Sequence, residues 1–102
     1  MSDVIYSYPL EQAIEDGVLV AVFKKRWDVL SSGKPIVATS HLFESVSLAA
    51  LVEIWNEFVH WRKTVMSTLP EEEQMFVTKV NNESIWVIED GQAFTLLYPE
   101  DY

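Results

Sequence analysis

Two histidines and a large set of carboxylates are the groups in this sequence that could support acid-base or metal chemistry. Glu53, Glu57 and His60 are spaced i, i+4 and i+7, so they share one side of any helix that contains them. Glu57 and His60 have the Glu-x-x-His spacing of carboxylate metal sites in helical bundles, but such sites need a second pair of this kind. His41 is the one further imidazole. We therefore interpret these residues as a polar helix face and predict no metal site.

Nucleophilic and nucleotide chemistry find no supporting motif. The chain has no Cys, which excludes a disulfide framework, a thiolate metal site and a thiol nucleophile. Its glycines are isolated at positions 17, 33 and 91, so neither a nucleophile elbow nor a Gly-rich phosphate loop can be drawn. We predict that the protein is not an enzyme, with no catalytic residue and no cofactor. A small hydrolase or metal enzyme that uses His41 or His60 ranks third among the possible functions, after two binding roles.

Net charge bears on the class of partner. The 102 residues contain 7 Lys and Arg against 16 Asp and Glu, a formal charge of −9. Such a chain repels phosphates, which disfavours direct binding of nucleic acid. The one basic cluster, residues 24–26 followed by Trp27, is interpreted as a solvated segment.

The acidic side chains of the last third are the sharpest functional feature of the sequence. They fall in expected turns and in the tail, where carboxylates face water and can present a spaced negative surface to a basic groove, as the phosphates of duplex DNA would. Aromatic residues are also abundant, and Tyr and Trp are enriched at interface hot spots. We predict a partner-binding surface with Trp61 and Tyr98 as exposed aromatic anchors and with these acids: Glu71, Glu72, Glu73, Glu89, Asp90, Glu100 and Asp101.

The elements that would position these residues follow from hydrophobic periodicity. Apolar residues at helical spacing predict a long amphipathic helix over about 48–67. Two-residue periodicity predicts a three-stranded antiparallel meander over 75–80, 84–88 and 93–98. Further expected elements are a short helix over 9–16, a strand over 18–23 buried on both faces, helical turns over 24–30, a strand over 35–38 and a helix from about His41.

These elements predict an α+β fold in which a long amphipathic helix packs on a small antiparallel sheet with a C-terminal three-stranded meander. The length predicts a single domain over residues 1–102. The apolar face of helix 48–67 exceeds what one small meander covers, so a self-associating module, a homodimer through that face, is the main alternative function.

Residues 1–8 show neither a basic segment nor an apolar signal-like run, and the sequence has no stretch of 18 apolar residues. These features predict a cytoplasmic protein with no membrane partner.

The N-terminal quarter resembles a known family. Ile5-Tyr6-Ser7-Tyr8 and the block over 12–20, QAIEDGVLV, are similar to the opening of short uncharacterised proteins encoded on plasmids, phages and other mobile elements. The segments over 35–39 and 97–101 are similar in placement. The resemblance implies a mobile-element setting, in which small acidic domains often inhibit host defence nucleases, and it implies no catalytic residue.

The sequence therefore predicts a non-enzymatic acidic inhibitor of phage or plasmid type. Its expected partner is a host protein or nucleoprotein complex with a basic surface. An anti-CRISPR or anti-restriction role is the concrete form of this prediction.

Overall fold

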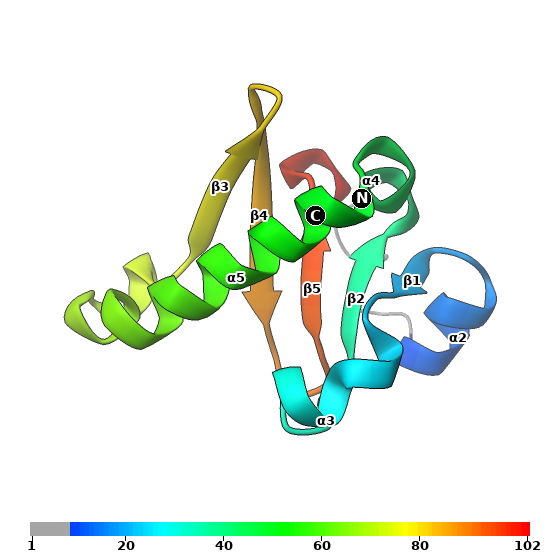
Figure 1. The fold of residues 1–102 in the computed structure, drawn as a ribbon, viewed down its shortest axis with the longest axis horizontal. Helices are drawn as coiled ribbons and strands as arrows, with labels where there is room; N and C mark the ends of the chain where they lie inside the picture. The colour runs from blue at the N-terminus through cyan, green and yellow to red at the C-terminus, as the bar shows by residue number, and fades with distance from the viewer. Residues whose placement is uncertain (1–8) are drawn as a thin grey trace.

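The structure is a computed structural model that describes residues 9–102. The Ile5–Tyr8 block of the family resemblance lies outside the described residues. Figure 1 shows a twisted sheet crossed by one long helix, with the shorter helices around one end of the sheet.

The sheet has five strands in the order β1-β2-β5-β4-β3. The strands are β1 (Leu19–Ala21), β2 (Ile36–Thr39), β3 (Phe76–Val80), β4 (Glu83–Glu89) and β5 (Phe94–Leu97). β3, β4 and β5 form the predicted antiparallel meander, and β1 pairs antiparallel with β2. β2 and β5 run parallel, with Ile36 opposite Phe94 and Ala38 opposite Leu96. The α+β fold, the long helix and the meander are confirmed, and the parallel pair joins the two halves of the chain into one mixed sheet.

The α-helices are α2 (Leu10–Glu15), α3 (Trp27–Leu30), α4 (Ser40–Ser45) and α5 (Leu48–Thr64). Single 3-10 turns cover η1 (Lys24–Arg26), η2 (Met66–Thr68), η3 (Glu71–Glu73) and η4 (Pro99–Asp101). α5 is the longest helix of residues 9–102, and no helix in this range is long and apolar enough to cross a bilayer.

Local capping explains where the two central helices begin. The Thr39 hydroxyl accepts a hydrogen bond from the Leu42 amide at the start of α4, and the Ser47 hydroxyl accepts one from the Ala50 amide at the start of α5. Each bond satisfies an amide that the helix cannot pair internally. At the other end of α5, Arg62 and Lys63 lie in the last turn, where cations complement the helix dipole.

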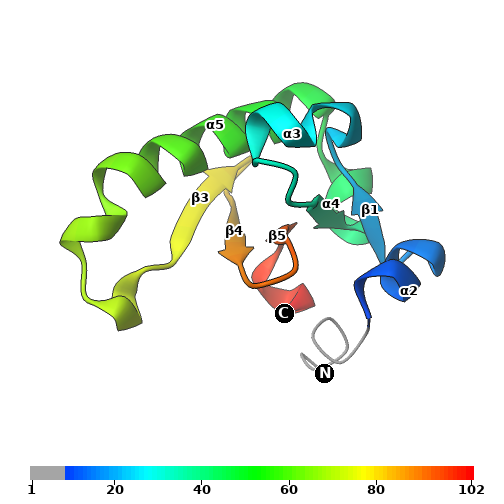
Figure 2. The same ribbon diagram turned by 90° about the horizontal axis from the view of Figure 1, so that it is seen from below.

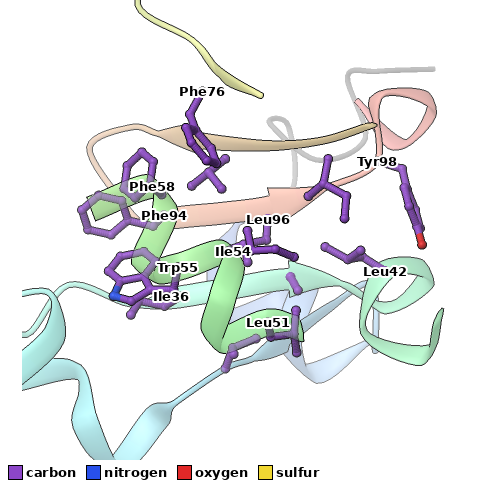
Figure 3. Packing of buried hydrophobic residues seen from close by; sticks show 14 residues of the cluster. Ile36, Leu42, Leu51, Ile54, Trp55, Phe58, Phe76, Phe94, Leu96 and Tyr98 are labelled. Atoms are coloured by element: carbon purple, nitrogen blue, oxygen red, sulfur yellow. The ribbon is translucent and has the colours of Figure 1, made fainter. Parts of the chain in front are cut away.

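Figure 2 shows α5 and α3 on one side of the sheet, and α2 and the C-terminus on the other. The main core lies between α5 and the sheet and contains Leu51, Ile54, Trp55 and Phe58 of the helix (Figure 3). Alternate strand residues meet them: Ile36, Ala38, Phe76, Ile85, Val87, Phe94 and Leu96. A smaller cluster on the opposite side joins Ala13 of α2 to Leu19, Val37 and Ala93.

The expected strand 18–23 is shorter in the structure, where β1 covers three residues and lies at the edge of the sheet. The segment still packs on both sides of the sheet, because Leu19 belongs to the cluster with α2 and Val22, directly after β1, belongs to the main core. β2 and β5 are the strands buried at all four positions, because each lies between two other strands and has side chains packed on both faces.

Candidate protein interface

The acidic turn η3 presents three carboxylates to solvent. Glu71, Glu72 and Glu73 are all exposed, and within residues 9–102 none of them forms a hydrogen bond or ion pair through its side chain. Figure 1 shows this part of the chain, between α5 and β3, projecting beyond the sheet at one end of the molecule. The predicted exposure of these three acids is confirmed.

A depression of about 260 Å³ lies beside this turn, between α5 and the sheet edge where β4 ends. We call it the Trp61 recess. Its lining includes Trp61 and Met66 from the helix side, Gln74 and Met75 directly after η3, and also Glu89 and Tyr102. Met75 and Tyr102 are 43% and 40% exposed, so the lining offers apolar surface to a partner as well as charge.

The recess has a defined shape because its borders are held by specific contacts. The Gln74 amide nitrogen donates to the carbonyls of Met66 and Leu69 at 3.1 and 3.0 Å, which ties η3 back to the end of α5. The Trp61 ring stacks on Phe58 with ring centres 6.2 Å apart and lies 5.6 Å from Phe76. Trp61 is half-buried, so one part of its ring is anchored in the core and another part is accessible.

Glu89 lies in the recess but its charge is matched within the chain. Arg62 holds it with two parallel bonds, Nε to Oε1 at 2.9 Å and Nη2 to Oε2 at 3.0 Å, and Lys34 Nζ lies 3.5 Å from Oε2. Both cations also lie over the Phe94 ring, at 4.9 Å for Lys34 and 5.8 Å for Arg62. The bonds to Arg62 and Lys34 therefore fix the position of the Glu89 side chain where it lines the recess.

Asp90 and Asp101 also bind partners within the chain. Asp90 Oδ1 accepts the amides of Gln92 and Ala93, which shapes the turn between β4 and β5. Asp101 accepts a bond from the Thr39 hydroxyl at 3.1 Å and lies 3.1 Å from His41 Nδ1. These two acids hold the chain together, whereas Glu100 is exposed in η4.

The prediction that Tyr98 is an exposed anchor is wrong, because Tyr98 is 4% exposed. It continues the alternation of Phe94 and Leu96 on the side of β5 that faces the helix, and its ring lies 4.7 Å from the His41 ring. Figure 3 shows Tyr98 beside Leu42 at one end of the core.

The predicted acids do not form one continuous surface. Figure 1 places η3 beyond β3 at one end of the molecule and the C-terminal turn η4 near α4. Asp101 of this turn contacts Thr39 and His41. The structure brings together Trp61 and Glu89 in one recess, with the acids of η3 immediately before its lining residues Gln74 and Met75.

The two histidines lie apart from each other, on α4 and α5. His41 contacts Asp101 and Tyr98, and His60 is exposed on α5. Glu57 accepts a bond from the Thr78 hydroxyl of β3 at 2.6 Å, which ties the helix to the sheet. Within residues 9–102, no group of three or more His, Asp or Glu side chains is placed to hold a metal ion.

The sequence alone did not indicate that Met75 and Tyr102 line the Trp61 recess. It also did not indicate that Lys34 and Arg62 both pair with Glu89. Met75 could have been found from its place as the first residue of the predicted strand 75–80, directly after the acidic run. The pairing of Glu89 with two cations has no local signal, because Lys34 and Arg62 lie 55 and 27 positions away along the chain.

Comparison of the chain with protein-family models, curated protein sequences and solved structures found no match. The geometry of the recess and its acidic border is therefore the basis for a functional assignment.

Proposed function

We propose that this protein is a non-enzymatic binding protein that docks on a basic surface of another protein through η3 and the Trp61 recess. The observation that carries the proposal is the placement of three unpaired carboxylates immediately before the lining of a recess that contains a half-buried tryptophan. Carboxylates at the border would steer a basic partner, and apolar side chains in the recess would anchor it.

The setting suggested by the N-terminal sequence block makes the proposal more specific. In a mobile-element setting, the partner would be a nucleic-acid-binding complex of host defence in the cytoplasm, and docking would block its basic groove. In its most specific form, the proposal is that the protein is an anti-CRISPR or anti-restriction inhibitor. The exposed acids of η3 support it because they can compete with phosphates for the same cations.

The test is affinity capture of the tagged protein from host lysate at low and high salt, followed by mass spectrometry. We expect a nucleic-acid-binding complex to be retained at low salt and released at high salt, because contacts between exposed charges are screened. The double variant Glu72→Lys with Glu73→Lys should lose the complex without unfolding, since both side chains are exposed.

A matched control is Glu44→Lys with Glu83→Lys, two exposed acids in α4 and at the start of β4. This control changes net charge by the same amount and should keep the complex. Retention of the complex by the Glu72→Lys, Glu73→Lys variant would remove η3 from the interface. Recovery of the protein alone at both salts would favour a self-associating module.

A further inference from the structure

A second depression, of about 220 Å³, lies between η1, α3 and the outer side of α5. Its lining is Phe23, Arg26, Leu30, Val52, Trp55 and Asn56. We call it the basic recess. Trp55 is 3% exposed and links the recess to the core, whereas Val52 is 41% exposed. Leu48, one turn before Val52 on the same side of α5, is 64% exposed and extends the apolar surface.

The cations next to this recess have no partner of their own. Lys24, Lys25 and Arg26 are exposed, and within residues 9–102 none of them lies within 4 Å of a carboxylate oxygen. By contrast, Lys34 and Arg62 are paired with Glu89. Arg26 lines the recess, whereas Lys24 lines another depression together with Glu11 and Glu15. In a chain of net charge −9, Arg26 and its neighbour Lys25 therefore place unpaired positive charge beside the apolar surface.

The recess also presents a hydrogen-bond donor to solvent. The Trp55 indole N–H donates to no acceptor within residues 9–102, and it is open to water, because no buried side-chain nitrogen in this range lacks a partner. Figure 3 shows the indole nitrogen at the edge of the labelled core cluster. An oxygen atom of a bound partner can therefore replace water as the acceptor of this N–H.

The backbone at the recess is held in a strained conformation. Phe23 has φ 58° and ψ 34°, in the left-handed region that bulky residues avoid. The Trp27 indole nitrogen donates to the Val22 carbonyl at 2.7 Å, and the Arg26 amide donates to the Phe23 carbonyl at 2.8 Å. These bonds hold the turn that places Phe23 and Arg26 on the same recess, and such strain is often found at ligand clamps.

We infer that the basic recess binds an acidic segment of another protein that carries an apolar anchor residue. The anchor would lie against Phe23, Leu30 and Val52, and its flanking carboxylates would meet η1 and the Trp55 N–H. A peptide fits these features better than nucleic acid, because aliphatic side chains make up half of the apolar lining and the whole chain repels phosphates. This surface is separate from η3 and the Trp61 recess.

The test is selection of short random peptides displayed on phage against the immobilised full chain, followed by affinity measurements on the selected peptides. We expect enrichment of sequences in which Asp or Glu flanks Leu, Phe or Trp. Val52→Asp, and separately Lys25→Glu with Arg26→Glu, should weaken the selected peptides by about tenfold or more.

Two matched controls keep the result specific. Val65→Asp changes a valine of similar exposure, 39%, at the other end of α5. Lys63→Glu with Lys79→Glu changes two other exposed cations that also lack an ion pair within the described residues. Both controls, and Glu72→Lys with Glu73→Lys, should keep peptide affinity, so a failure of the Trp61 recess as an interface would leave this result unchanged.

Five outcomes would overturn the inference. Four of them are enrichment of no peptide, enrichment of peptides that are not acidic, equal binding by the Val52→Asp variant and the parent chain, and binding of labelled oligo-dT that Lys25→Glu with Arg26→Glu abolishes. Concentration-dependent self-association that Val52→Asp removes would assign the recess to a second copy of the chain and would also overturn it.

Discussion

Arg62 of α5 and Glu89 at the end of β4 are joined by two parallel hydrogen bonds of 2.9 and 3.0 Å. This pair ties the last turns of the long helix to the sheet, and its acidic member, Glu89, lines the Trp61 recess. It also shows how an acid in a predicted turn can serve the fold instead of a partner. The first prediction follows from this arrangement.

Glu89→Gln should lower the free energy of unfolding by about 0.5 to 1 kcal/mol, because partly exposed ion pairs contribute little even with good geometry. The Arg62 and Glu89 side chains are 46% and 30% exposed. The measurement is urea unfolding at low and high salt, with the difference between the two proteins shrinking at high salt. An effect that does not depend on salt would contradict an electrostatic role.

Thr39→Ala should destabilise the protein by about 1 kcal/mol, because the Thr39 hydroxyl caps α4. The same hydroxyl donates to Asp101, so its loss also frees the C-terminal turn. Thr39→Ser keeps the hydroxyl and is the control. If the two variants unfold at the same urea concentration, the hydroxyl is not the stabilising group.

Phe58→Ala should cost about 3 to 5 kcal/mol, as expected for removal of a buried aromatic side chain. Phe58 is 3% exposed, and its ring contacts Trp55, Trp61, Phe76 and Phe94. Phe58→Leu keeps most of the buried volume and should cost clearly less. Urea unfolding monitored by tryptophan fluorescence measures both, and equal losses would mean that ring contacts dominate over cavity formation.

The homodimer alternative makes a separate prediction. The sheet already covers the broad apolar face of α5 at Leu51, Ile54, Trp55 and Phe58. We therefore expect light scattering to show a monomer at concentrations well above micromolar. A stable dimer would support the self-associating module, and Leu48→Glu, at the most exposed apolar position of α5, would show whether that helix forms the contact.

Much of the fold could be predicted because its determinants are local. The start of α4 follows from Thr39, and the buried face of α5 from its apolar spacing, although α5 ends at Thr64 and not near residue 67. The β3–β4 turn follows from Asn81 and Asn82, which both adopt positive φ. The exposed acids of η3 were predictable for the same reason, since a short polar turn after Pro70 has little to pack against.

The remaining features depend on which segments meet. The same alternation that predicts β5 also places Tyr98 beside Phe94 and Leu96, but its burial requires α4 to lie against the end of that strand. The edge position of β1 follows from strand order, which a run of β-branched residues does not encode.

By itself, the sequence determined the kinds of element, the α+β class and the acidity of η3, because caps, periodicity and turn residues act over a few positions. Only the tertiary structure decided which acids stay free. Glu89 and Asp101 meet cationic or hydroxyl partners that are distant in the chain, whereas Glu71–Glu73 project from the end of the molecule. Pairing across such separations depends on how α5 packs on the sheet and on how the C-terminal turn lies against β2, and residues of α5 also line both recesses.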